Sequence, residues 1–460
     1  MLNAKTVFTS IGGRGVALSI SLMLIPVYIF HVGVEGYGVI SAILLLQTFS
    51  GIFEGGLSQT ISREIAVNKI KVDAASGNLG GIIKASEIAV VVGAGLLCSI
   101  LVGAMLVYGQ FWIKATTTDS AEIKVCFLLM GIIVFNAAYG GFLHGGLQGL
   151  ERQTDSNIII SLSCIFRLIF VALFPFIIIW KTAAIFLAIA TSSIVETAAV
   201  RFVLLKKLPI NYIQSAPSWG LLFSVRDMAI SSWAIALTAL AKSHGDRFVA
   251  SSMVDMKNFG AYSLMTAVYQ TVLSGVYPIA NAAWPTIARS YSSGNLIELL
   301  STIRKMRLLI LVGGFIVILL SLVINASNPL YLRLSKYASS DLGKMLPVFV
   351  GSGFLAGFAT VPHLTILASN HQKNLVFLNV IQGAVGVLGT FLCLKSAGVV
   401  ALAIFQNFLN LVFLWALEYS AFQCLSRDFR YSKISCDDKR MYLACALAGV
   451  IPNLILMILK

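Results

Sequence analysis

Apolar stretches of about 20 residues recur along the whole sequence, and this recurrence limits the fold more than any other feature. As a helix, each stretch is long enough to cross the ~30 Å hydrocarbon core of a bilayer. Only helices and closed barrels satisfy their backbone hydrogen bonds in lipid, and these stretches lack the alternation of barrel strands. Charged residues make up 11% of the chain, against about 25% in soluble proteins. The sequence therefore predicts an all-α, polytopic membrane protein without a soluble domain.

We expect twelve membrane-spanning helices joined by short loops. The predicted spans are 10–32, 38–61, 80–108, 122–148, 157–180, 183–205, 222–247, 258–287, 306–327, 343–368, 374–395 and 399–424, and an apolar tail at 441–459 is a candidate thirteenth. No small-residue cleavage site follows the first stretch, which favours an uncleaved span over a signal peptide. The seven cysteines stand singly, without the spacing of a metal site or a disulfide framework. We therefore expect no metal and no other cofactor.

Basic residues fall mostly in alternate loops. If the N-terminus is cytoplasmic, 17 Lys and Arg residues lie in the predicted cytoplasmic loops and 7 in the opposite ones. Arg152, Lys206 and Lys207 are among those on the cytoplasmic side. This bias matches the positive-inside rule and predicts a cytoplasmic N-terminus. The formal net charge of +14 thus reflects membrane topology and does not indicate a nucleic-acid partner.

The loop at 206–221 divides the predicted spans into six and six. A weak repeat relates the segment 35–41 (EGYGVIS) to 257–263 (KNFGAYS) at an offset of about 222 residues. Because an even number of spans separates the copies, both halves would have the same orientation. We therefore predict two six-helix lobes, residues 1–215 and 216–430, followed by a charged linker and a short apolar segment at 431–460.

Glycines recur one helical turn apart in three of the predicted spans. Small residues at this spacing let helices approach each other closely in a membrane. The glycines concerned are Gly51 and Gly55, then Gly141, Gly145 and Gly149, and finally Gly353 and Gly357. We expect close helix contacts along these three stripes.

Several short segments carry a resemblance to a known family. They are 33–38 (GVEGYG), 54–66 (EGGLSQTISREIA), 246–247 (DR), 260–263 (GAYS) and 284–289 (WPTIAR). Together they resemble the polysaccharide-synthesis (O-antigen, Wzx-type) flippases of the multidrug/oligosaccharidyl-lipid/polysaccharide (MOP) superfamily. Glu54 stands where such proteins often carry Asp.

The resemblance implies a MATE-like fold of two six-helix bundles that form a V and open alternately to either membrane face. It also implies a substrate, an undecaprenyl-pyrophosphate-linked oligosaccharide, moved from the cytoplasmic to the periplasmic leaflet of a bacterial inner membrane. The lipids of that membrane, a polysaccharide polymerase and a chain-length regulator would then be partners.

A pyrophosphate that crosses hydrocarbon needs a hydrated, cationic cavity, because an uncompensated charge there is costly. Arg167, about ten residues into the fifth predicted span, is the clearest cavity candidate. A buried ion pair with Glu196 of the sixth span is the alternative. Arg14 either faces the cavity or extends to the cytoplasmic interface. Lys84 either contacts substrate or pairs with Glu87, three residues further along the same helix.

The seventh predicted span carries four ionisable residues within one and a half turns: Lys242, His244, Asp246 and Arg247. Lys242 and Asp246 are four residues apart on one helix face and are placed to pair, and Arg247 points elsewhere. Lys242 and Arg247 complete the cationic candidates. The candidates for gating or ion coupling are Asp246, Glu54, Glu196 and His144. For His144, a packing role is the alternative to carrying a proton.

Two other classes of protein stay open at this stage. A MATE-like, ion-coupled exporter of drugs or small molecules would be expected to use acidic residues deep in its spans. A membrane-embedded polymerase, ligase or acyltransferase would need a sizeable extramembrane loop, and none is predicted, so we expect no enzyme. The sequence has no Gly-x-x-x-x-Gly-Lys-Ser/Thr loop for ATP. An ion gradient, the membrane potential or consumption of the product would then supply the energy.

Overall fold

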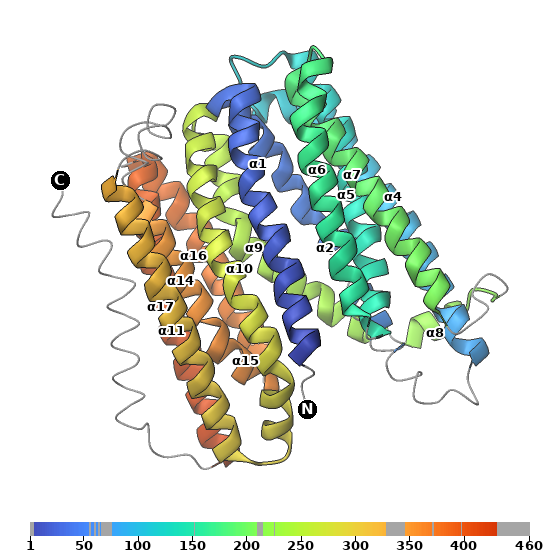
Figure 1. Cartoon of the computed structure of the whole chain (residues 1–460), viewed down its shortest axis with the longest axis vertical. Coiled ribbons are helices and arrows are strands. Elements are labelled where there is room, and N and C mark those ends of the chain that lie inside the picture. Colours follow the sequence, from blue (N-terminus) through green and yellow to red (C-terminus); the bar gives the residue numbers. More distant parts are fainter. Residues whose placement is uncertain are drawn as a thin grey trace. The chain divides into compact units, whose positions relative to one another are not determined.

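The computed structural model describes the backbone of residues 4–54, 57–58, 61–62, 65, 76–150, 152–208, 215–224, 226–327, 346–369, 372–396 and 398–429. It describes no side chains for 4–18, 76–79, 317–327 and several positions within 221–236 and 278–285. The described residues are helical, with short turns and no strand (Figure 1). They form two compact units, the first unit at Ala4–Leu240 and the second unit from Ala241 onward. The candidate thirteenth span lies outside the described residues, and the predicted lobe boundaries stay predictions.

The first unit is a bundle of long helices. Its elements are α1 (Ala4–Leu44), the 3-10 helix η1 (Leu45–Phe49), α2 (Ser50–Phe53), α4 (Ser76–Trp112), α5 (Ser120–Gly149), α6 (Gln153–Ile177), α7 (Lys181–Lys207), α8 (Trp219–Ser224) and the first part of α9 (Arg226–Met253). Helix α5 packs against α4 and α7, α7 packs against α6, and α6 packs against α1. Figure 1 shows α4 to α7 running side by side.

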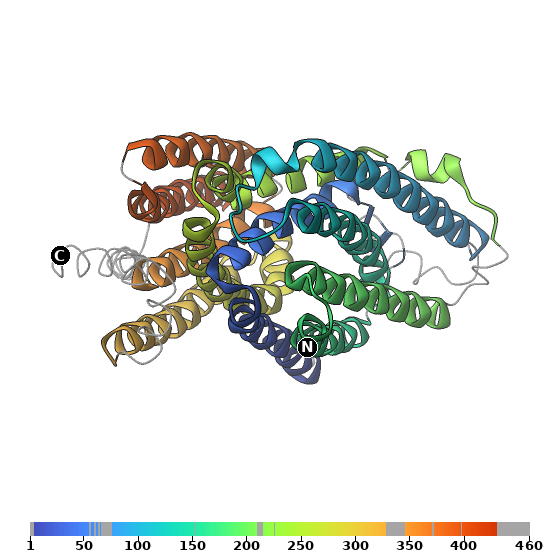
Figure 2. The ribbon, with the colours of Figure 1, turned by 90° about the horizontal axis from the view of Figure 1, so that it is seen from above.

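The second unit contains the end of α9 and six further helices. These are α10 (Met256–Ser292), α11 (Leu296–Ser327), α14 (Leu346–Phe358), α15 (Thr360–Ala368), α16 (Gln372–Ser396) and α17 (Gly398–Phe429). Helix α14 packs against α10, α11 and α17. Figure 2 shows α16 and α17 as neighbouring helices at the red end of the colour scale.

Each predicted span between 10 and 424 overlaps one or more of these helices. Helix α1 covers the first span and the start of the second, which continues through η1 and α2. Between the two spans α1 is broken at Gly33, whose φ of 73° favours glycine. Among the described residues, eight segments are long and apolar enough to cross a membrane, and the first of them, Ser19–Phe53, contains this break. The all-α transmembrane class is confirmed, whereas the count of twelve spans stays a prediction.

The glycine stripe on α5 allows a close helix contact, as predicted. A Cβ atom on Gly145 would lie 2.3 Å from the Ser58 hydroxyl oxygen and 2.7 Å from the Ser58 carbonyl oxygen. One turn further, a Cβ atom on Gly149 would lie 2.6 Å from the Ser62 carbonyl oxygen. Side chains at these positions would clash with a neighbouring backbone, so only glycine permits the observed approach.

The second unit repeats this device between α14 and α10. A Cβ atom on Gly353 would lie 2.7 Å from the Tyr269 carbonyl oxygen, and one on Gly357 would lie 2.6 Å from Val276 Cγ2. The second predicted span thus meets the fourth in one unit, and the eighth meets the tenth in the other. An internal repeat requires this correspondence, although the repeat itself stays a prediction.

The pair Gly51 and Gly55 is described only at Gly51, which shows no such contact. No atom lies within 4 Å of a Cβ atom built on Gly51, and Gly55 lies outside the described residues.

Two carboxylates fix helix ends in the first unit. Glu122 of α5 is buried and accepts the backbone N–H groups of Thr182 (2.7 Å) and Ala183 (3.1 Å), so it acts as a cap at the start of α7. Glu35 of α1 accepts the N–H of Thr117 at 3.1 Å and further hydrogen bonds from its neighbour Thr116. Glu35, which belongs to the segment 33–38 (GVEGYG), therefore fixes the loop between α4 and α5.

Adding one methyl group at Gly145 tests the α5 contact. We expect Gly145→Ala to lower stability by about 1–3 kcal/mol, because the new methyl group overpacks the interface. Gly103→Ala on α4 is the matched control, since a Cβ atom at Gly103 has no neighbour within 4 Å. Thermal unfolding of the purified protein should show a lower midpoint for Gly145→Ala alone. Equal midpoints for the two variants would contradict the contact.

Candidate functional site

Helices α5, α6 and α7 bring five polar side chains together within the predicted fourth, fifth and sixth spans. The first-unit polar cluster consists of His144 on α5, Ser163 and Arg167 on α6, and Ser192 and Glu196 on α7. The spacing of four residues puts Ser163 and Arg167 on one face of α6, and likewise Ser192 and Glu196 on one face of α7. The two faces meet because α6 packs along α7.

Glu196 has two partners in this cluster. Its Oε2 accepts a hydrogen bond from the Ser163 hydroxyl at 2.7 Å, and its Oε1 lies 3.4 Å from His144 Nε2. The other ring nitrogen of His144 lies 2.7 Å from the buried Ser156 hydroxyl. A hydroxyl both donates and accepts, so His144 keeps both contacts whether it is neutral or protonated. His144 is therefore part of a polar network and not an isolated packing residue.

Arg167 is half-buried and is held by a hydroxyl group. Its Nε donates to Ser192 Oγ at 3.2 Å, and Ser192 in turn donates to the Ile189 carbonyl at 2.8 Å. The described ion pair of Glu196 is with His144, not with Arg167, although Arg167 is near enough to act on Glu196 electrostatically. Among the described residues, only the Nε–H of the guanidinium has a hydrogen-bond partner. The remaining N–H groups point to an anion-binding capacity.

In the second unit, α9 presents its ionisable residues to α10 and α16. Lys242 donates to Asn379 Oδ1 at 3.2 Å, and Asp246 accepts from the Tyr262 hydroxyl. The structure describes no contact between Lys242 and Asp246, the pairing that their spacing along α9 allows. Each residue has a partner on a neighbouring helix, and these cross-helix contacts replace the contact along α9.

The second-unit polar cluster consists of Lys242, Asp246, Asn379 and Tyr262, and the amide side chains of Gln382 and Asn410 extend it. Gln382 donates to Asn410 Oδ1 at 3.3 Å, and Asn410 donates to Ser352 Oγ at 2.8 Å. Arg247 Nε and His244 Nδ1 are buried and have no hydrogen-bond partner among the described residues. Since buried polar atoms are nearly always satisfied, these two atoms indicate a place for water or a polar ligand.

Lys84 and Glu54 make other contacts. Lys84 donates to the Ser215 carbonyl at 2.9 Å and so ties the loop before α8 to α4. Glu54 is half-buried, and its Oε1 accepts the N–H of Ser58 at 3.1 Å, beside the glycine stripe of α5. Both contacts lie where neighbouring segments meet, and the predicted roles of Lys84 and Glu54 stay predictions. The side chain of Arg14 lies outside the described residues.

One buried ion pair was missed by sequence reasoning. Arg307 Nη2 of α11 lies 2.8 Å from Glu418 Oε2 of α17, and the two side chains are only 9% and 11% exposed. The predicted ninth span, 306–327, puts Arg307 at the very start of the span, whereas α11 begins at Leu296. No local pattern relates residues 111 positions apart, so only the tertiary structure reveals this pair.

The hydroxyl partners Ser156, Ser163 and Ser192 were also missed. A usable signal was present for α6, because Ser156, Ser163 and Arg167 are spaced by seven and four residues and therefore share one helix face.

Comparison with solved structures identifies the fold. An inward-facing multidrug resistance MATE family transporter of the MOP superfamily matches with a TM-score of 0.71 and 14% identity, covering 91% of this chain and 99% of the other. An outward-facing MATE family transporter matches with a TM-score of 0.62 and 15% identity over 93% and 96%. The eukaryotic MATE transporter AtDTX14 matches with a TM-score of 0.60 and 13% identity over 97% of both chains. The chain is a multi-pass membrane protein with the MOP transporter fold.

The family follows from the sequence comparison. The family model described as polysaccharide biosynthesis protein matches residues 4–291, more than half of the chain. The chain belongs to this family, and the expected recognition is confirmed. No curated protein matches the sequence. Family and fold together define a membrane flippase or exporter.

The Arg307–Glu418 pair should be structural, and its energetics distinguish it from a surface pair. We expect Arg307→Met alone to destabilise the protein by about 3–5 kcal/mol, because it leaves a buried carboxylate without its counter-ion. The double change Arg307→Met with Glu418→Leu should recover most of that loss. The control is Arg289→Gln, which breaks an exposed pair with Glu298 (66% and 40% exposed) and should cost about 0–1 kcal/mol. Thermal unfolding measures all three variants, and a double variant as unstable as the single one would argue against the pair.

Proposed function

We propose that the chain is a flippase for an undecaprenyl-pyrophosphate-linked oligosaccharide, an O-antigen, capsule or exopolysaccharide repeat unit. It would carry this lipid from the cytoplasmic to the periplasmic leaflet of a bacterial inner membrane. Membership of the polysaccharide biosynthesis protein family supports this substrate class. A polysaccharide polymerase and a chain-length regulator would act on the product.

The observation that carries the proposal is the state of Arg167. This cation lies within an apolar span, half-buried, with one described hydrogen bond to a neutral hydroxyl. A cation in such a place is costly unless it has a counter-ion or water, so a functional anion is its natural partner. The guanidinium fork suits a phosphate better than an ammonium group does. The pyrophosphate of the lipid would supply that anion.

The second-unit polar cluster supports the same substrate. Lys242 and Arg247 add cationic groups, and the amides of Gln382 and Asn410 are suited to hydrogen bonds with sugar hydroxyls. The buried Arg247 Nε without a described partner is consistent with a polar ligand.

Alternating access is the mechanism that fits this fold. MATE transporters matching the chain are described in inward-facing and in outward-facing conformations. The distribution of basic residues supports a cytoplasmic N-terminus. For energy coupling, the His144–Glu196 pair is the candidate, because His144 keeps its contacts in both protonation states.

The rival within the superfamily is a multidrug exporter like the matching MATE transporters. Both classes use the same fold, so the charge of the substrate separates them. Acidic residues are present in both units, but Glu196 and Asp246 already have described partners, whereas most N–H groups of Arg167 have none among the described residues. This difference favours an anionic substrate. A membrane-embedded polymerase or acyltransferase has no support from either family or fold.

Deleting the gene tests the function directly. Lipid-linked repeat units should accumulate on the cytoplasmic leaflet, and the surface polymer should disappear and return with a plasmid copy. Leaflet-selective labelling and surface-polymer gels measure the two effects. A strain that keeps its surface polymer but becomes sensitive to cationic drugs would favour the exporter instead.

Substitution of Arg167 tests the site. Arg167→Ala should reduce transport by about tenfold or more, because a charge-assisted contact contributes about 1.5–3 kcal/mol. Arg167→Lys should keep part of the activity if the charge matters more than the guanidinium geometry. The control is Arg427→Ala, which removes an exposed arginine near the end of α17. Transport is measured at equal membrane levels, and wild-type activity in Arg167→Ala would exclude this residue from the site.

A further inference from the structure

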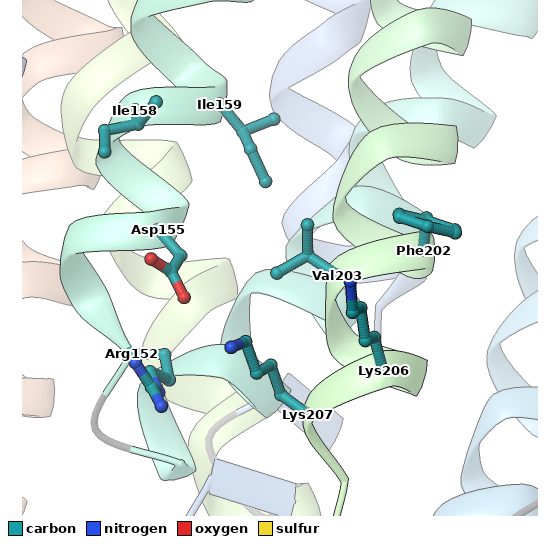
Figure 3. Close-up of a pocket in the computed structure, with 8 residues that line it drawn as sticks. All are labelled: Arg152, Asp155, Ile158, Ile159, Phe202, Val203, Lys206 and Lys207. Atoms are coloured by element: carbon teal, nitrogen blue, oxygen red, sulfur yellow. The ribbon is translucent and has the colours of Figure 1, made fainter.

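A crevice lies between the start of α6 and the end of α7 (Figure 3). Its volume is about 330 Å³. The residues that line it are Arg152, which precedes α6, then Asp155, Ile158 and Ile159 of α6, and Phe202, Val203, Lys206 and Lys207 of α7. Three cations and one carboxylate form its polar part, and apolar side chains form the rest.

The polar and apolar parts of the crevice are separated along the helices. Figure 3 shows the head groups of Arg152, Asp155 and Lys207 turned toward one space, with Ile159 and Val203 one to two turns deeper in the span. The apolar part opens to the outside of the bundle, because the residues Ile158 and Phe202 are 53% and 68% exposed. A ligand seated here would have an anionic head at the membrane interface and an apolar tail along the helices.

The side chains that line the crevice carry a net positive charge. The crevice carries three exposed basic side chains against a single Asp155, so its net charge favours an anionic ligand. The α6 backbone contributes in the same direction, since the crevice contains its first turn, where the N–H groups face outward and the helix dipole is positive. Basic pockets between transmembrane helices on the cytoplasmic side are suited to phospholipid head groups.

We propose that this crevice binds an anionic glycerophospholipid, with its phosphate at Arg152 and Lys207 and its acyl chains along Ile158 and Phe202. A volume of about 330 Å³ suits a phosphate with its glycerol and is small for an oligosaccharide. The bound lipid would therefore be a component of the bilayer and not the transported glycolipid. Such a lipid would join the cytoplasmic ends of α6 and α7, the two helices that hold Arg167 and Glu196. The proposal does not depend on the flippase function.

The test measures lipid binding to the full-length purified protein by native mass spectrometry and thermal unfolding. The probes are phosphatidylglycerol, phosphatidylcholine and inorganic phosphate. Phosphatidylglycerol should bind and raise the unfolding midpoint. The triple variant Arg152→Gln, Lys206→Gln, Lys207→Gln should bind it roughly a hundredfold more weakly, since each basic residue contributes about a fivefold factor. The matched control is Lys114→Gln, Lys124→Gln, Lys181→Gln. It removes the same charge from three exposed lysines elsewhere in the first unit and should bind like wild type.

A second variant keeps the test decisive if the triple variant does not fold. Asp155→Asn removes the competing carboxylate and should strengthen phosphatidylglycerol binding. Lys206→Arg with Lys207→Arg should retain it, because the charge is kept. Equal binding of phosphatidylcholine would overturn the proposal, as would the same midpoint shift with inorganic phosphate alone, or equal loss in the control triple variant. Flippase activity is not a readout, so failure of the transport assay and failure of this proposal are distinguishable.

Discussion

A charged side chain in hydrocarbon needs a partner, and this requirement organises the interior of both units. Glu122 is satisfied by the first amides of α7, and Arg307 by Glu418. Within the first-unit polar cluster, Glu196 takes its partners from two neighbouring helices. These charged side chains are thus neutralised or hydrogen-bonded by other groups of the protein. Arg167 differs from these residues, because its described partner is a neutral hydroxyl, and the proposed substrate contact rests on this difference.

Helix contacts through glycine set where those charged groups meet. Because Gly145 and Gly149 lack side chains, α5 reaches the backbone of the segment that carries Ser58 and Ser62. This contact fixes one face of α5, and His144, the residue before Gly145, contacts Glu196 of α7. In the second unit, the stripe on α14 meets α10, which carries the Tyr262 partner of Asp246. In each unit a rigid glycine contact therefore lies next to a polar cluster.

The two ends of α6 and α7 have different chemistry. Deep in the spans, these helices share hydroxyl, carboxylate and guanidinium groups that contact one another. At the end with Arg152 and Lys207, they share basic groups that face outward into a crevice. The first set is suited to a substrate enclosed by the protein, and the second to the surrounding lipid. One helix pair thus carries both the proposed transport site and the proposed lipid site.

Much of the fold was predictable from the sequence, because membrane insertion depends on local apolarity and length. Each predicted span up to 424 falls on a helix, and the connection between the first two contains the break at Gly33. The glycine stripes of α5 and α14 were also visible, since their spacing is a property of one helix. Arg167, Glu196 and His144 were recognisable as unusual because a polar residue stands out within an apolar stretch.

Which residues pair was decided only by the tertiary structure. The sequence offered Asp246 as a partner for Lys242 because both lie on one helix face, but Asn379 and Tyr262 approach from other helices. The same holds for Arg307 and Glu418, which are 111 residues apart in sequence. The sequence alone determined that this chain enters the membrane as helices with charges inside them. The packing of those helices decided which charges are neutralised, because a contact between distant segments leaves no periodic trace in either one.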